Sequence, residues 1–285
     1  MEVRRESSAV TNKKRLFMFP ANTVNDLFAT WSSIGKLCQP LTETQWKTPT
    51  ACPGWSVQDI ISHLIGIERG MMGMEPTAHR SVRFDYVKNP IGEANEHEVD
   101  SRRSLTGAQV LSEWSDIVIR RTEALRTADE SYFSTSARTP LGPGTVADFL
   151  QLRVLDCWIH EQDIRRALNM PGNESGPAAE STIDRLLGTL PMVIGKRSAT
   201  PEGETVNFRI TGPVSRSLFI TVLNGRAAVV DTPPVNVRTS FSIDSNTFVA
   251  LATGRTTSDA AASQWSASGD KELAMRIAQN LNMMI

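Results

Sequence analysis

The chain has 285 residues, of which 40% are hydrophobic and 21% are charged, and its formal net charge is −1. This near-neutral balance excludes a global basic field that would recruit nucleic acid or an anionic membrane, so we expect small molecules or other proteins as partners. Three widely spaced cysteines form no disulfide framework, and no apolar run approaches the roughly 18 to 20 residues of a membrane span. We therefore expect a cytoplasmic protein, with room for two domains.

The N-terminal part is predicted to be helical. Residues 1 to 20 read as a polar tail, because they lack the long apolar segment and the cleavage site of a signal peptide. Apolar residues recur at spacings of three and four over residues 21 to 37, which predicts an amphipathic helix. A second helix is expected to begin after Ser56, which can cap it together with Asp59.

Two further long helices are expected over residues 106 to 127 and 145 to 168, separated by the break "PLGPG". Residues 73 to 104 carry prolines, glycines and mixed charges, so they read as a long connection with at most short helical pieces. Such a connection could act as a lid over a site. Four long helices with one long crossover predict a four-helix bundle.

The C-terminal part has a different texture. The segment "NMPGNESGPAAES" marks a boundary, and a helix is expected over residues 181 to 194. The runs "TVNFRIT", "RSLFITVL" and "AAVVDT" are typical of strands, and Asn224-Gly225 between two of them is a hairpin signal. A strand followed by a short helix capped at Asp244 or Ser245 comes next, and a last helix is expected over residues 271 to 283. These elements predict a smaller α+β domain.

Three polar residues stand out on the apolar helix faces: His63, Asp156 and His160. Asp156 and His160 are four residues apart, so they share one face of a helix. A buried carboxylate without a partner is costly, and a hydrogen bond to His160, or a pair with Arg153 or Arg165, would satisfy it. The alternative is a divalent metal bound by all three residues from two facing helices. Two nitrogens and one carboxylate oxygen suit zinc and leave an open position for substrate or water.

Two motifs carry a resemblance to a known family. "TACPGWSVQDIISHL" and "LDCWIHEQDIRRAL" closely resemble the mycothiol-dependent maleylpyruvate isomerase family, within the DinB-like metal-binding bundle superfamily. "DSNTFVALATGR" and "SGDKELAMRIAQNL" resemble the sterol-carrier-like domain that follows the bundle in that family. After the polar tail at residues 1 to 20, the resemblance implies a DinB-like helical bundle at 21 to 170, a linker and connecting helix at 171 to 200, and a sterol-carrier-like α+β domain at 201 to 285.

The resemblance also implies a chemistry. In the family, a histidine, a carboxylate and a second histidine bind a divalent metal, usually zinc, and these positions fall on His63, Asp156 and His160. The implied thiol cosubstrate is mycothiol, which a bound cation would favour as thiolate for attack on a small-molecule electrophile. The same three residues serve an isomerase or an S-transferase. The family's best-known isomerase has glutamate where this chain has Asp156.

A second hypothesis is a non-catalytic protein that binds an apolar ligand in its C-terminal domain and keeps a structural or vestigial metal. A third is a bundle without metal, in which Asp156 and His160 only form a hydrogen bond.

The sequence leaves the roles of several further residues undecided. Asp163 and Arg165 could orient ligands or form a surface charge pair. Cys52 and Cys157 are expected to pack as small buried residues, and His79 and His97 to face solvent. Arginines of the second domain, such as Arg209, Arg216 or Arg238, could reach the metal cleft, and the sequence does not show which of them does.

Overall fold

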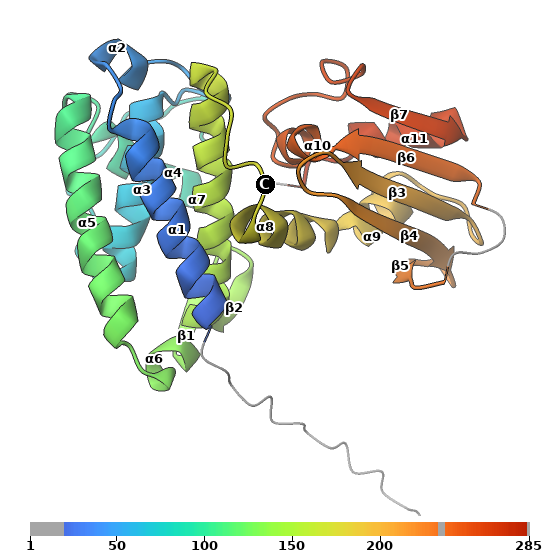
Figure 1. The fold of residues 1–285 in the computed structure, drawn as a ribbon, viewed down its shortest axis with the longest axis horizontal. Helices are drawn as coiled ribbons and strands as arrows, with labels where there is room; N and C mark the ends of the chain where they lie inside the picture. The colour runs from blue at the N-terminus through green and yellow to red at the C-terminus, as the bar shows by residue number, and fades with distance from the viewer. Residues whose placement is uncertain (1–19, 233–236, 284–285) are drawn as a thin grey trace, which may run out of the picture.

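The computed structural model describes residues 20–232 and 237–283 of the chain. The polar tail expected at residues 1 to 20 lies outside this range except for Pro20. A helical part and a smaller part built on a sheet lie side by side, and α8 (Pro177–Leu187) leads from one to the other (Figure 1). The predicted α plus α+β class is confirmed. Among the described helices, none has the length and apolar character needed to cross a membrane.

Four long helices form the N-terminal bundle, as their apolar periodicity predicts. They are α1 (Ala21–Cys38), α3 (Val57–Met71), α5 (Gly107–Thr127) and α7 (Val146–Leu168). Each contributes large apolar side chains to one core, among them Trp31, Ile34, Ile61, Trp114 and Leu150. Burial of each such side chain stabilises the bundle by about 1.5 to 3 kcal/mol.

Short elements complete the helical part. They are α2 (Glu43–Trp46), α6 (Glu130–Ser134) and a hairpin of β1 (Ser136–Thr139) and β2 (Gly142–Thr145). The hairpin includes the "PLGPG" segment, where the sequence predicts only a break. Its strands are four residues each and bury only Thr139, so they carry no alternating apolar signal.

The long connection contains a full helix, where the sequence predicts at most short helical pieces. This is α4 (Pro90–Asp100), which packs against α3. The Asn89 side chain caps it by accepting the Gly92 N–H, and Pro90 occupies its first turn. Only Glu96 and Val99 are buried in α4, so its apolar period is too weak to reveal it.

Helix α7 belongs to two cores at once. Leu150, Val154 and Ile164 lie in the bundle core, whereas Leu155, Trp158 and Ile159 pack in the core of the C-terminal part. Figure 1 shows α7 on the side of the bundle that faces the second part. The middle of α7 therefore lies between the two cores.

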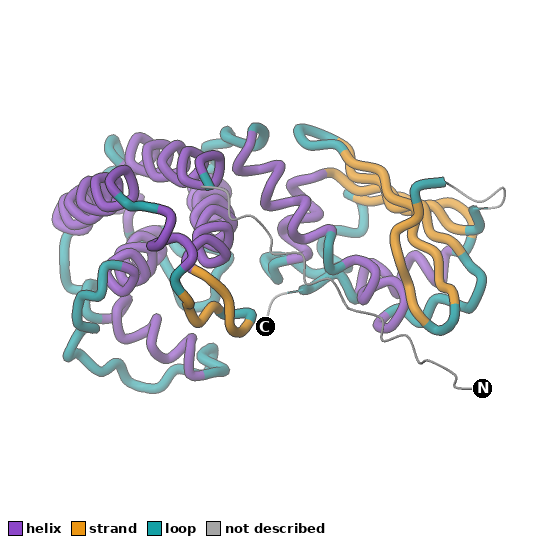
Figure 2. Tube along the Cα trace, turned by 90° about the horizontal axis from the view of Figure 1, so that it is seen from below, coloured by secondary structure: helices purple, strands orange, loops and turns teal. Residues whose placement is uncertain are grey.

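The C-terminal part is a five-stranded sheet with helices against one face (Figure 2). The strand order is β5-β4-β3-β6-β7, with β3 and β6 parallel and the other neighbours antiparallel. The strands are β3 (Thr205–Thr211), β4 (Arg216–Leu223), β5 (Arg226–Val230), β6 (Thr239–Asp244) and β7 (Trp265–Gly269). The helices are α8, α9 (Leu190–Met192), the π-helical turn η1 (Val193–Arg197), α10 (Ser245–Ala252) and α11 (Lys271–Gln279).

Most of these elements agree with the sequence patterns. The strands expected at "TVNFRIT" and "RSLFITVL" are β3 and β4, and Asn224 and Gly225 form the turn after β4 with φ of 55° and 71°. The helix expected over residues 181 to 194 begins earlier, at Pro177, and ends at Leu187, with α9 and η1 after it. The last helix, expected to reach residue 283, ends at Gln279. Strand β7 is not expected, because its sequence "WSASG" is small and polar after the tryptophan.

Candidate metal centre

His63 on α3 lies together with Asp156 and His160 on α7. The Nε2 atom of His63 is 3.3 Å from Asp156 Oδ2, and Nε2 of His160 is 3.5 Å from Asp156 Oδ1. One ligand-type atom from each residue lies within 4.8 Å of the other two. Both histidines are buried, whereas the Asp156 side chain keeps 31% of its exposure. The three residues singled out by sequence are thus assembled around a partly accessible carboxylate.

Local sequence fixes where these side chains point. Ser56 and Asp59 form the capping box at the start of α3, since the Ser56 hydroxyl accepts the Asp59 N–H and the Asp59 carboxylate accepts the Ser56 N–H. His63 follows the cap by two helical turns. Asp156 and His160 are one turn apart in the middle of α7, so both face α3 from the same side.

The indole of Trp55 forms a wall of the centre. Its ring centroid is 5.1 Å from that of His63 and 6.1 Å from that of His160. The indole N–H donates to Glu96 Oε2 at 2.9 Å, and Glu96 is buried on α4. Trp55 thus contacts both histidines of the centre and is held in place from α4.

A buried network of charges supports Asp156 from behind. Arg153 donates to Asp156 through Nη1 and to Glu68 Oε1 through Nε, the latter at 2.9 Å. Arg121 donates to the other oxygen of Glu68 at 3.0 Å. Burial alone would raise the pKa of Asp156, but the charge of Arg153, followed by those of His160 and His63, holds it well below its usual value. Asp156 is therefore a carboxylate.

His160 has a second carboxylate partner on its other side. Its Nδ1 atom lies 3.1 Å from Asp163 Oδ2. Burial by itself lowers the pKa of His160, but the charge of Asp156 and the hydrogen bond to Asp163 outweigh it and raise this pKa to about 10. The pKa of His63 is lowered instead, because burial outweighs the pull of Asp156. One histidine of the pair is thus a cation and the other is neutral.

Arg255 of the C-terminal part reaches this region, in place of the arginines considered from sequence. Its Nη2 lies 2.9 Å from Asp163 Oδ2 and 3.2 Å from Cys52 Sγ. Arg209 is exposed on β3, Arg216 pairs with Asp184, and Arg238 pairs with Glu204. The available sequence signal was "ATGR", a helix end followed by a cation, which does not reveal where the side chain points.

The structure shows the contacts and burial of the other residues whose roles the sequence leaves undecided. Asp163 and Arg165 do not form a surface pair with each other: Asp163 is fully buried with His160 and Arg255, and Arg165 pairs with Glu161. Cys157 is buried, as expected. His79 is exposed, whereas His97 is half-buried and contacts Ser81.

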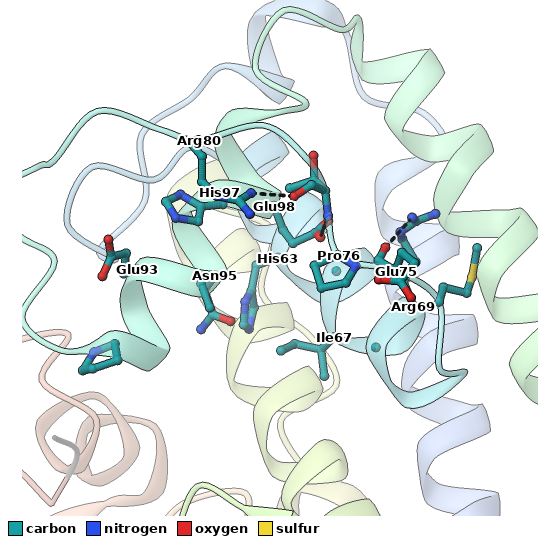
Figure 3. Close-up of a pocket in the computed structure, with 16 residues that line it drawn as sticks. His63, Ile67, Arg69, Glu75, Pro76, Arg80, Glu93, Asn95, His97 and Glu98 are labelled. Atoms are coloured by element: carbon teal, nitrogen blue, oxygen red, sulfur yellow. Dashed lines mark hydrogen bonds between the residues drawn. The ribbon is translucent and has the colours of Figure 1, made fainter.

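A cavity of about 470 Å³ opens beside the centre, between α3, α4 and the segment that joins them. Figure 3 shows His63 in its wall, between Asn95 of α4 and Ile67 of α3. His97 and Arg80 lie at another side of the same cavity. This volume is in the range of small-molecule sites. The long connection, considered as a lid from sequence, therefore forms part of a cavity wall through α4.

The donor set fits a divalent metal. Two donors that share a tetrahedral zinc ion at bonds of about 2.0 to 2.2 Å lie about 3.3 Å apart. The separation of 3.3 Å between His63 Nε2 and Asp156 Oδ2 is close to this value, and His160 Nε2 lies 3.5 Å from the other carboxylate oxygen, Oδ1. Both imidazoles present Nε2 to the carboxylate, and the Nδ1 atom of His160 is engaged elsewhere. In the metal-free protein these nitrogen and oxygen atoms are joined by hydrogen bonds or ion pairs, and a metal cation can take the place of the protons between them.

Two family models match the two parts of the chain. The family model described as the mycothiol maleylpyruvate isomerase N-terminal domain matches residues 27–165, and the model for the C-terminal domain of that isomerase matches residues 180–276. The three residues of the centre lie within the first match. A search of curated protein sequences finds no significant match.

Among solved structures, the chain is similar to a mycothiol-dependent maleylpyruvate isomerase at a TM-score of 0.55 and 16% identity, over 89% of this chain and 95% of the other. A histidine-to-alanine mutant of such an isomerase gives a TM-score of 0.53 at the same identity and coverage. At this identity the similarity establishes a shared two-part fold.

Proposed function

We propose that this chain, which belongs to the mycothiol maleylpyruvate isomerase family, is a metal-dependent enzyme that uses a small thiol to attack an electrophilic small molecule. The observation that carries the proposal is the convergence of His63 and His160 on the carboxylate of Asp156, within the family's N-terminal domain. The proposed metal is zinc and the proposed thiol is mycothiol. We place the enzyme in the cytoplasm, because its three cysteines are free.

The residues of the centre have separate roles in the proposed reaction. His63, Asp156 and His160 would hold the metal, and Arg153 keeps Asp156 ionised and ready to ligate. When bound there, a divalent cation lowers the pKa of a coordinating thiol and so supplies a thiolate at neutral pH. Two neutral imidazoles and one carboxylate leave such a site with one positive charge, which a single thiolate would neutralise. The Trp55 indole would cover the metal on the side of the two histidines.

The cavity beside His63 gives room for the cosubstrate or the electrophile. In an isomerase, the thiolate would add to a cis double bond, permit rotation about the resulting single bond, and then leave. In a transferase it would add and remain. Both reactions need the same thiolate, so they differ only in whether the carbon–sulfur bond breaks again.

The decisive test is turnover with the thiol counted. Zinc-loaded protein is mixed with mycothiol and maleylpyruvate, and both the isomer and the remaining thiol are measured. We expect isomer formation without loss of thiol for an isomerase, and one thiol consumed per electrophile for a transferase. Protein treated with a chelator is the control and should be inactive. If no electrophile reacts, while apolar ligands raise the melting temperature, the chain is a binding protein and the proposal is wrong.

Metal binding should depend on pH in a defined direction. In the metal-free protein His160 holds a proton up to about pH 10, whereas the lowered pKa of His63 leaves that ring neutral. A metal must displace the His160 proton, so its affinity should rise about tenfold per pH unit between pH 7 and 9 and level off near pH 10. Chelator competition at three pH values measures the slope. Calorimetry in two buffers of different ionisation enthalpy should give about one proton released per ion, and an affinity independent of pH would contradict the assignment.

A further inference from the structure

His160 is held on both sides by carboxylates that differ in exposure. Asp156, facing Nε2, keeps 31% of its side-chain exposure, whereas Asp163, facing Nδ1, has none. A histidine that binds a metal through one nitrogen commonly donates the N–H of the other nitrogen to a carboxylate, which fixes the tautomer and the ring orientation. Asp163 stands in that relation to His160.

Asp163 is itself fixed by groups outside α7. Arg255 contacts it through two nitrogens, with Nη2 2.9 Å from Oδ2 and Nε 3.2 Å from Oδ1. The Cys52 thiol donates to Oδ2 at 3.3 Å. Arg255 in turn is anchored at the end of α10, where its backbone N–H donates to Ala250 and its Nη1 to the Thr253 carbonyl. The carboxylate is therefore clamped by the loop before α3 and by the C-terminal part of the chain.

The same atoms fit a second metal site less well. Ligand-type atoms of Cys52, His160 and Asp163 also lie within 4.8 Å of one another. The Arg255 guanidinium, however, already lies 3.2 Å from the Cys52 sulfur and 2.9 Å from Asp163. A metal between these groups would have to displace a buried cation that is hydrogen-bonded to both, at considerable electrostatic cost. A supporting role for Asp163 accounts for the mutual contacts of all four side chains, Cys52, His160, Asp163 and Arg255.

We propose that Asp163 is a positioning residue that aims Nε2 of His160 at the metal position, and that Arg255 holds Asp163 in place from the C-terminal domain. The inference rests on the proposed metal centre and adds a role for docking of the second domain. When a metal displaces the other ring proton and Nδ1–H stays donated to Asp163, the lone pair of His160 is on Nε2 and is directed at the metal position. Without the carboxylate, the other tautomer and other ring orientations become available.

The test compares two buried carboxylates on the same helix. Asp163→Asn keeps the shape and removes the charged acceptor, and Glu161→Gln makes the same change at a buried carboxylate that contacts Ser33, Arg165 and Asn173 instead. Co²⁺ is titrated into each metal-depleted protein, with affinity from chelator competition and geometry from the visible absorption spectrum. We expect Asp163→Asn to bind about 10- to 100-fold more weakly with an altered spectrum, and Glu161→Gln to stay within about twofold of wild type.

The outcomes separate the two proposals. Wild-type affinity and an unchanged spectrum in Asp163→Asn would overturn the positioning role and leave the metal centre standing. A wild-type protein that binds no Co²⁺ would overturn the metal centre and, with it, the inference. If Asp163→Asn fails to fold, Arg255→Lys replaces it, since the side chain of Arg255 lies partly exposed at the domain junction. A smaller loss of affinity in the same direction is expected, and no loss would contradict the clamp.

Discussion

Replacing His160 with alanine should remove the bound metal. We expect wild-type protein, purified without chelator, to carry about one divalent ion per chain, and His160→Ala to carry almost none. The loss of a ligand should exceed the roughly 10- to 100-fold cost of losing an outer hydrogen-bond partner, so thiol-dependent turnover should fall with the metal. Elemental mass spectrometry on untagged protein measures the content directly.

A matched control is His79→Ala, because His79 is an exposed histidine that pairs with Asp100 outside the centre. It should keep the wild-type metal content. Equal metal content in wild type and His160→Ala would mean that the ion binds elsewhere. Metal in neither protein, even after reloading, would remove the thiolate mechanism and leave Asp156 as a hydrogen-bond partner only.

Coupling between the two histidines gives an independent check. Both contact Asp156 in the absence of metal, so some coupling between His63→Ala and His160→Ala is expected from that shared partner alone. A shared metal adds to it. The free energies of unfolding of the single and double variants should therefore deviate more strongly from additivity with zinc than with chelator, and an identical deviation in both conditions would argue against the metal.

The fold could be predicted where the pattern was long and regular. The helices around Trp31, Ile61 and Trp114 repeat apolar residues at helical spacing, and the strands before Asn224 are rich in β-branched residues. The missed elements have no such period. Helix α4 buries two residues only. Strand β7 forms because it pairs with β6, and this pairing depends on the tertiary fold and not on a local sequence pattern.

The sequence indicates the three residues of the centre more clearly than it indicates the residues that support them. His63, Asp156 and His160 stand out as polar residues on apolar helix faces, and they lie within the two motifs that carry the family resemblance. Arg255 gives no comparable sign, because it is 92 positions away from Asp163 and comes together with it only when the two parts of the chain pack. Charged residues that meet across a domain junction have no spacing rule that a single sequence can reveal.

The buried charges behind Asp156 raise a separate question about stability. Glu68 has no exposed surface and accepts from both Arg121 and Arg153, whose side chains are 1% and 3% exposed. Each arginine depends on this carboxylate to offset the cost of leaving water. Arg153 has a second anionic partner in Asp156, whereas Arg121 has only the Tyr132 hydroxyl besides Glu68 among the described contacts.

Glu68→Gln should therefore destabilise the bundle strongly, by about 3 to 5 kcal/mol, because it leaves a buried cation without its counter-charge. Urea unfolding followed by circular dichroism at the helix band measures the change in free energy of unfolding. Glu180→Gln is the control, since the same substitution at an exposed carboxylate paired with Arg216 should cost less than about 1 kcal/mol. Adding Arg121→Met to Glu68→Gln should recover part of the loss by removing the orphaned cation. If Glu68→Gln instead matches Glu180→Gln, water or a rearranged partner reaches the arginines, and the network is not what fixes Arg153 beside Asp156.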